Sequence, residues 1–293
     1  MNLDDFKVRE NSNIKLSDYP TDYTSKYKLK EDAKEVLREN IIKMAEYQDK
    51  LYAEKKYALL IIFQAMDAAG KDSAIKHVMS GLNPQGTQVF SFKQPSVEEL
   101  NHDYLWRISK SLPERGRIGV FNRSHYEDVL VVRVHNLINN QNLPLSIINN
   151  NIWKKRFEQI RDFEKYLANN GIIQIKIFLH LSKKEQKKRF LKRIDDPSKN
   201  WKFSASDLKE REYWDAYQNY YEEAINETST KHSFWYIIPS DIKWFARFVI
   251  SEIINQTLSQ LDLNYPEVDE EQKKILNDCK EKLLNNSDKL NNF

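Results

Sequence analysis

The sequence predicts an α/β fold in which helices cover a parallel β-sheet. Short apolar runs rich in β-branched and aromatic residues alternate with longer helical patterns along most of the 293 residues. The run YALLIIF (57–63) is apolar throughout, which is typical of a strand buried on both faces of a parallel sheet. Gly70-Lys71 and a helical pattern follow it, so a strand, a tight loop and a helix are expected in that order.

The elements are expected in a regular order. A polar arm with several tyrosines (1–28) precedes a helix with apolar residues at helical spacing (29–54). Five strands are predicted, at 57–63, 87–92, 117–122, 172–181 and 234–239. Helices are predicted from about Gly70 and at 97–112, 124–134, 152–169, 183–195, 206–226 and 242–258, with a polar tail after Pro266 for which a helix is one expectation. Since strands that alternate with helices are joined by right-handed crossovers, the sheet should be parallel.

The composition is that of an ordinary globular protein, with 40% hydrophobic and 30% charged residues. The net charge of +3 arises from 46 basic and 43 acidic residues, so the overall balance does not select a partner. The single cysteine, Cys279, cannot form an internal disulfide, which fits a reducing compartment. No stretch has the pattern of a signal peptide or the roughly 18 apolar residues of a membrane span. These observations predict a cytoplasmic protein without membrane contact.

The segment QAMDAAGKDS (64–73) has the pattern of a phosphate-binding loop with two substitutions. Gly70 and Lys71 supply the second glycine and the lysine of a Walker A motif. Ala65 replaces the first glycine, and Asp72 replaces the hydroxyl residue that usually binds magnesium. Backbone N–H groups at a helix start attract an anion, and small side chains leave it room, here Ala68, Ala69 and Gly70. We therefore favour a phosphate loop over an ordinary strand-to-helix turn.

Asp67 places a negative charge inside this loop. A carboxylate about 4 Å from a phosphate oxygen is repelled by roughly 1–4 kcal/mol, depending on the local dielectric. A divalent cation between the two groups converts that repulsion into attraction. The usual Ser/Thr ligand is missing, and Ser73 stands one position too late. We interpret Asp67 as a metal ligand; the alternative is that it stabilises the turn or caps the helix.

The segment FNRSHYED (121–128) follows another predicted strand. Arg123 lies at the carboxyl end of that strand, where open α/β sheets bind ligands, and an arginine there can bind phosphate oxygens with both arms of its guanidinium. Ser124 and Glu127 have capping-box spacing, which gives Glu127 a structural explanation, whereas Asp128 has none. Arg133 interrupts an apolar face, so we expect it to bind an anion or to form an internal ion pair.

The helix KKEQKKRFLKR (183–193) carries seven basic residues and one acidic residue. A solvated face is the usual explanation for such a run, but its place between two core strands also fits a lid that binds a polyanion. Aromatic residues recur at helical spacing in the next helix, which favours a packing face over a platform for bases: Tyr213, Trp214, Tyr217, Tyr220 and Tyr221.

Five segments together resemble the polyphosphate kinase 2 family over about residues 57–248. They are QAMDAAGKDSAIKHVMSGLNPQG, FKQPSVEELNHDYLWR, LPERGRIGVFNRSHYEDVLVVRV, WKFSASDLKEREYWDAYQ and WYIIPSDIKWFARF. The form FNRSHYED resembles the subgroup, class III, that phosphorylates both AMP and ADP. The resemblance implies a thymidylate-kinase-like P-loop kinase fold, a three-layer sandwich with about five parallel strands and a mobile helical lid. It also implies inorganic polyphosphate as phosphoryl donor, Mg²⁺ or Mn²⁺ as cofactor, and a homodimer or homotetramer.

The resemblance also divides the chain and assigns its site. Residues 1–56 would be an arm and helix packed on the core, 57–264 the P-loop kinase core with its lid at about 183–228, and 265–293 a tail. By position, the residues that match the active site of the family are Asp67, Lys71, Arg123 and Asp128. The expected phosphate- and polyphosphate-binding residues are Ala68, Ala69, Gly70, Lys71, Asp72, Ser73, Arg133, Arg189 and Arg193. The nucleotide candidates are Asn83, Pro84 and Lys93, and the expected metal ligands are Asp67 and Asp128, with Glu127 a weaker candidate.

The expected activity is reversible transfer of a phosphoryl group from polyphosphate to AMP, ADP or other nucleoside mono- and diphosphates. An ATP-dependent nucleoside monophosphate kinase is the first alternative, although the missing Walker A hydroxyl and the basic lid argue against it. A nucleic-acid-binding protein is the second, and the nearly neutral charge and lack of a recognisable binding motif argue against that.

Overall fold

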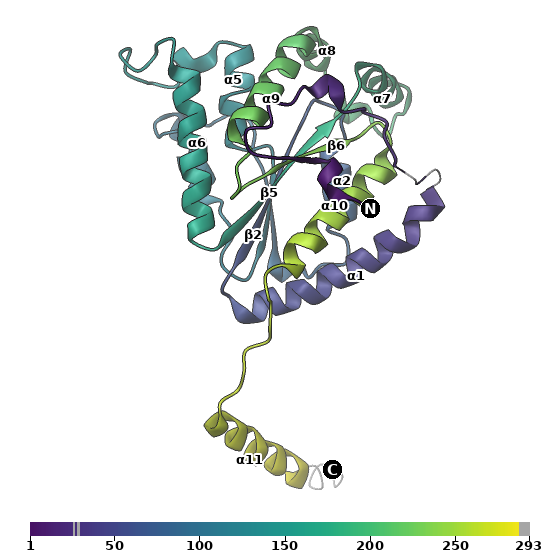
Figure 1. Cartoon of the computed structure of the whole chain (residues 1–293), viewed down its shortest axis with the longest axis vertical. Coiled ribbons are helices and arrows are strands. Elements are labelled where there is room, and N and C mark those ends of the chain that lie inside the picture. Colours follow the sequence, from purple (N-terminus) through teal and green to yellow (C-terminus); the bar gives the residue numbers. More distant parts are fainter. Residues whose placement is uncertain (26, 28–29, 287–293) are drawn as a thin grey trace.

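The computed structural model describes residues 1–25, 27 and 30–286. These residues form a six-stranded sheet of order β1-β6-β5-β2-β4-β3 (Figure 1). The strands are β1 (Lys7–Val8), β2 (Ala58–Ala65), β3 (Thr87–Ser91), β4 (Ile118–Asn122), β5 (Ile172–His180) and β6 (Trp235–Pro239). The five predicted strands are all present and pair in parallel. The sixth, β1, pairs antiparallel with β6, so the predicted number was one too low.

The centre of the sheet is its most apolar part. All eight residues of β2 are buried, and β2 pairs with β5 on one side and β4 on the other. Because helices cover both faces, no residue of this strand can face water, which explains why its sequence does not alternate between apolar and polar. The carboxyl ends of β2 and β4 therefore meet at one edge of the sheet, beside each other.

Helices form a layer on each face of the sheet (Figure 1). One core cluster joins the sheet to α1 (Lys30–Glu54), α2 (Lys71–Val78) and α10 (Lys243–Ser259). The second cluster joins the other face to α6 (Ile152–Asn169) and α9 (Trp214–Thr228). Trp214, Tyr217 and Tyr221 of α9 are buried in this second cluster and Tyr220 packs against it, which confirms the packing interpretation for these four residues, whereas Tyr213 is exposed.

Three predicted helices are each divided in two. The segment 97–112 contains α3 (Val97–Leu100) and α4 (Trp106–Lys110), and the helix predicted at 206–226 corresponds to α8 (Ala205–Glu212) and α9. The segment 124–134 contains a 3₁₀ turn, η4 (His125–Asp128), and the short helix α5 (Val131–Val134). The capping box expected for Ser124 and Glu127 does not form, because Ser124 Oγ accepts a hydrogen bond from the backbone N–H of Tyr126 instead. A capping role therefore does not explain the presence of Glu127 at this position.

The remaining elements lie at the periphery. Helix α7 (Lys183–Asp195) agrees with its predicted range, and further 3₁₀ turns are η1 (Leu3–Asp5), η2 (Leu16–Asp18), η3 (Pro84–Gly86), η5 (Leu137–Asn140) and η6 (Asn200–Lys202). The tail contains the exposed helix α11 (Glu270–Asn286), which stands apart from the sheet in Figure 1. Over the described ranges, no helix is both long and apolar enough to cross a membrane.

Candidate active site

The loop between β2 and α2 turns on two residues with left-handed backbone. Gly70 has φ 107° and forms the N-cap of α2, and Ala68 has φ 61°. A left-handed alanine costs of order 1–3 kcal/mol, and such residues are found where a functional geometry requires them. Gly70 is the residue that adopts this region without that cost. The predicted loop of small residues therefore does form a tight turn that leads into a helix start.

Lys71 is the first residue of α2, and its side chain extends back towards the end of β2. Its ammonium group donates a hydrogen bond to the backbone carbonyl of Ala65 at 2.8 Å. Burial and the nearby charge of Arg123 lower the pKa of Lys71 to about 8, against the opposite effect of Asp67 and Glu127. Among the described residues no carboxylate forms an ion pair with this ammonium group, and a bound phosphate would supply an anionic partner.

Arg123 directly follows β4 and lies next to the loop between β2 and α2. Its backbone N–H donates to the carbonyl of Phe63 at 3.0 Å, and its guanidinium lies 3.2 Å from an Asp67 carboxylate oxygen. The charge of Glu127, followed by that of Asp67, raises the pKa of Arg123. Arg123 also has a left-handed backbone, with φ 67°. Two cationic and two anionic side chains therefore meet where β2 and β4 end: Asp67, Lys71, Arg123 and Glu127.

The residues beside Lys71 are held by neighbours outside the loop. Asn122 Nδ2 donates to the carboxylate of Asp72 at 2.7 Å, and Ser73 Oγ accepts a hydrogen bond from Arg247 at 2.7 Å. The carboxylate that replaces the Walker A hydroxyl is therefore bound to the end of β4. Neither partner was predicted, because both contacts join segments at least 50 residues apart.

Asp128 has different surroundings from Asp67. It is buried, accepts a hydrogen bond from Gln141, and has Arg156 and Arg107 among its neighbouring charges. Burial raises its pKa to about 6 in spite of these partners. The half-buried Glu127, by contrast, is among the charges that act on Lys71 and Arg123, and the assignment of Asp67, Asp128 and Glu127 as metal ligands stays a prediction. The described residues contain no cluster of three or more His, Cys, Asp or Glu side chains suited to a metal ion.

Arg189 on α7 supports the loop from behind. All five of its N–H donors are used: Nε donates to Glu185, and the two amino groups donate to the carbonyls of Ala68, Ala69, Ser240 and Asp241. The side chain is only 6% exposed. In this structure the guanidinium therefore holds the loop and the β6–α10 connection together, and it has no N–H left for a polyphosphate.

The other predicted basic residues also have partners within the chain. Arg133 forms an ion pair with Glu223 at 2.5 Å and lies over the ring of Tyr220, as the internal ion-pair alternative anticipated. Arg193 lies 3.8 Å from Asp207 and donates to the carbonyl of Lys202. The exposed cations of α7 are lysines, none of which was predicted individually: Lys183, Lys184, Lys187, Lys188 and Lys192.

A cavity of about 350 Å³ is lined by Asp128, the residue that follows Glu127 in the chain. Its walls include Leu100, Tyr104, Leu143 and Ile147, and its polar groups include Arg107, Asp128 and Arg156. The guanidinium of Arg156 lies 3.9 Å from the centre of the Tyr104 ring, and its buried Nε has no hydrogen-bond partner among the residues that the structure describes. An apolar cavity with a few converging polar groups is the usual form of a small-molecule site.

The predicted nucleotide residues occupy two places. Lys93 is exposed near this cavity, because its backbone carbonyl accepts a hydrogen bond from Arg107 at 2.8 Å. Asn83 lies against α1, where its backbone N–H and carbonyl both bond the side chain of Gln48, and Pro84 follows it in η3. None of these three lines the cavity.

Comparison with known proteins gives consistent matches. The sequence model of polyphosphate kinase 2 (PPK2) matches residues 27–266. An ADP-polyphosphate phosphotransferase of Rhodopseudomonas palustris is 50% identical over 281 residues, covering 95% of this chain and 97% of the relative. An AMP/ADP-polyphosphate phosphotransferase of Meiothermus ruber is 42% identical over 272 residues, 92% of this chain and 98% of the relative. The crystal structure of polyphosphate kinase 2 from Arthrobacter aurescens TC1 has a TM-score of 0.82 and 41% identity, covering 88% of this chain and 89% of that one.

Proposed function

Because the chain belongs to the polyphosphate kinase 2 family, we propose that it transfers phosphoryl groups from inorganic polyphosphate to ADP and AMP, and to other nucleoside mono- and diphosphates. The observation that carries this proposal is the meeting of Lys71, Arg123, Asp67 and Glu127 at the phosphate loop. Both substrates are polyanions, and this site offers two cations to their phosphates and two carboxylates to a divalent ion.

The chemistry is mainly a matter of position and charge. A phosphate oxygen of the acceptor forms a bond to the terminal phosphorus of polyphosphate, and the anhydride bond to the next phosphate breaks. The shortened chain leaves with that electron pair. The acceptor oxygen is ionised near neutral pH, so no general base is needed. We assign Lys71 and Arg123 to the transferred phosphoryl group, where they offset its developing charge. One phosphoanhydride replaces another, so the direction follows the concentrations.

Mg²⁺ fits the donor set of this loop, and Mn²⁺ is a substitute of the same kind. The carboxylates of Asp67 and Glu127 are hard oxygen ligands, and Mg²⁺ is usually held by one or two carboxylates together with phosphates and waters. The contribution of the metal is charge neutralisation between these carboxylates and the phosphates. We place Asp128 on the nucleotide side of the site, because it lines the cavity.

The cavity lined by Tyr104 and Asp128 is our candidate for the nucleoside part of the acceptor. Replacing Tyr104 with alanine should raise KM for ADP about tenfold, because stacking a base on an aromatic ring is worth about 1–3 kcal/mol. KM for polyphosphate should stay within about twofold. The exposed Tyr166 on α6 provides a matched control, since Tyr166→Ala removes the same ring away from the cavity. A rise confined to KM for polyphosphate would contradict the assignment.

The activity should decline above about pH 8. The pKa of Lys71 is lowered to about 8 from its usual value near 10.5, so the free enzyme loses this positive charge as the pH rises through that value. We expect kcat/KM for polyphosphate to fall up to tenfold per pH unit beyond it. The fall in kcat should begin at higher pH, because bound polyphosphate raises the pKa of Lys71. Flat profiles up to pH 9.5 would contradict the role of Lys71.

The exposed lysines of α7 are our candidates for the surface that guides the polyphosphate chain, and high salt should therefore weaken polyphosphate binding. A dimer or tetramer and a cytoplasmic location stay predictions.

A donor exchange tests the proposed function. The purified protein is incubated with AMP and magnesium, and either polyphosphate or ATP is added. Formation of ADP and ATP with polyphosphate alone supports the proposal. If only ATP serves as the donor, the protein is an ATP-dependent nucleoside monophosphate kinase. Full turnover without nucleic acid would dismiss the nucleic-acid-binding alternative.

A further inference from the structure

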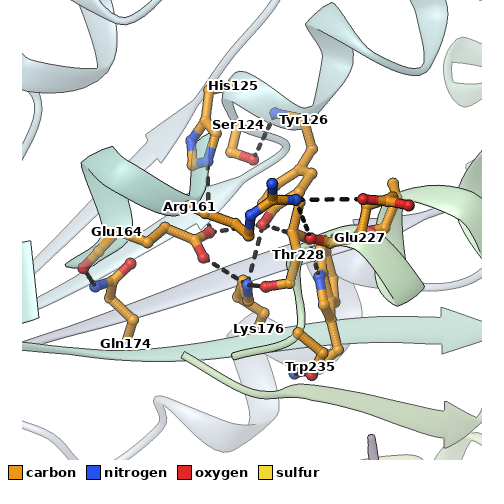
Figure 2. A network of polar contacts seen from close by, with 12 residues as sticks. Ser124, His125, Tyr126, Arg161, Glu164, Gln174, Lys176, Glu227, Thr228 and Trp235 are labelled. Atoms are coloured by element: carbon orange, nitrogen blue, oxygen red, sulfur yellow. Dashed lines mark hydrogen bonds and ion pairs between the residues drawn. The ribbon is translucent and has the colours of Figure 1, made fainter. Parts of the chain in front are cut away.

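We propose that Tyr126 is a positioning residue for phosphoryl transfer, through a buried charged network that fixes the segment carrying Arg123 and Glu127. This inference rests on the proposed function only for the identity of the substrates. Lys176 of β5 and Glu164 of α6 form the centre of the network, and both side chains are fully buried (Figure 2).

The hydrogen bonds of the network are complete around Lys176. Its ammonium group has three donors, and they reach the Glu164 carboxylate at 2.6 Å, the Thr228 carbonyl at 2.7 Å and the Tyr126 hydroxyl at 3.1 Å. Burial alone would raise the pKa of Glu164, but Lys176 and His125 lower it below its usual value. Burial lowers the pKa of Lys176 as well, and Glu164 acts against that effect, so each partner favours the charged form of the other in this 2.6 Å pair.

Tyr126 is the link between this pair and the active site. Its hydroxyl lies 2.6 Å from the second Glu164 oxygen and 3.0 Å from Thr228 Oγ1, which also accepts a hydrogen bond from Trp235. The contacts of Tyr126 thus extend to β5, α6, α9 and β6 (Figure 2). In the sequence, Tyr126 lies three residues after Arg123 and directly before Glu127.

The segment that holds Tyr126 has little regular structure of its own. It is a single 3₁₀ turn, η4, preceded by the left-handed backbone of Arg123. Further support comes from Ser124 Oγ, which accepts hydrogen bonds from the Gln64 side chain at 3.2 Å and from the Tyr126 N–H at 3.3 Å. A displacement of about 1 Å at a reacting centre can cost about 10²-fold in rate. Fixing the Tyr126 hydroxyl therefore fixes Arg123 and Glu127 where the phosphates must align.

Stability alone is a weak explanation for a buried ion pair in this position. Removing two charges from water costs several kcal/mol for each ion, and apolar replacements of such pairs are often neutral or stabilising. In this chain the benefit of the buried Lys176–Glu164 pair is that it fixes the geometry of η4. The sequence carries a signal for it, because Lys176 interrupts the apolar strand run IIQIKIFLH.

The test compares two tyrosines that each lose one phenol hydroxyl. Tyr126→Phe keeps the ring and removes the link, so kcat should fall at least tenfold while KM for both substrates stays within about twofold. Tyr236→Phe is the control, since Tyr236 is also largely buried but packs in the core cluster on the other face of the sheet. Wild-type kcat in Tyr126→Phe, or an equal loss in Tyr236→Phe, would overturn the proposal.

A double variant separates positioning from stability. Lys176→Met combined with Glu164→Leu removes both charges, so thermal unfolding should stay near or above the wild-type midpoint while kcat falls about tenfold. A stable double variant with wild-type kcat would also overturn the proposal. If the wild-type enzyme uses ATP instead of polyphosphate, the proposed function fails, but the same comparison of kcat values is made with ATP and still tests Tyr126.

Discussion

Replacing Lys71 with methionine is expected to lower kcat for ATP formation from ADP and polyphosphate by about 10³-fold. Lys71 starts the helix after the phosphate loop, and within the described part of the chain its half-buried ammonium group has one hydrogen-bond partner, the backbone carbonyl of Ala65. A fixed positive charge in such a site is worth most when charge develops on the transferred group, and removal of one comparable donor costs about 10²–10³ in kcat. Methionine keeps most of the length of the side chain and removes the charge.

Lys76 on the same helix provides the control for this variant. Its side chain is exposed, so Lys76→Met changes the net charge by the same amount without touching the loop. We expect kcat within about twofold of wild type for Lys76→Met, and unchanged thermal unfolding for both variants. Comparable losses in the two variants would show that the effect is one of general charge rather than of the phosphate loop.

Replacing Asp67 with asparagine is expected to lower kcat about 10²-fold and to raise the magnesium concentration for half-maximal activity at least tenfold. Asparagine retains an oxygen that can accept the hydrogen bond from Arg123, now at 3.2 Å, but it lacks the negative charge that we propose as a ligand of the divalent ion. Without the metal, phosphate oxygens would face the loop with less of their charge compensated. A titration of activity with MgCl₂ at saturating ADP and polyphosphate measures both effects.

The second loop carboxylate, Asp72, provides the matched comparison. It occupies the position of the usual Walker A hydroxyl, yet its carboxylate accepts a hydrogen bond from Asn122 at 2.7 Å. We expect Asp72→Asn to shift the magnesium requirement by less than about threefold. If Asp72→Asn shifted it and Asp67→Asn did not, the metal would be bound at the ordinary Walker A position instead.

Much of the fold could be predicted because the core strands carry strong local signals. The wholly apolar run of β2 and its position before Gly70-Lys71 identify a central parallel strand and its loop. By contrast, β1 has only two residues, too few to show any period, and it depends on pairing with β6 at the other end of the chain. The prediction of one continuous helix over 124–134 was wrong. The segment begins with the 3₁₀ turn η4, which is held by side-chain contacts with distant segments.

The candidate site was also predictable in part: the residues with a local sequence signal could be identified, and the contacts between distant segments could not. Asp67, Lys71 and Arg123 follow from spacing within a loop and at a strand end, and the structure brings them together. The distinction between Glu127 and Asp128 required the actual turn, since a continuous helix with a capping box would have kept Glu127 occupied. The internal partners of Arg189 are equally invisible in the sequence, because four of its five contacts lie more than 50 residues away.

One ³¹P NMR time course tests the central claim most directly. The sample contains the purified protein, ADP, polyphosphate and MgCl₂, with no ATP at the start. We predict that the γ-phosphate signal of ATP grows as polyphosphate residues disappear, one for one, and that a parallel sample of Lys71→Met shows neither change. ATP formation at the same rate without polyphosphate, or unchanged polyphosphate signals while the protein interconverts AMP, ADP and ATP, would contradict it.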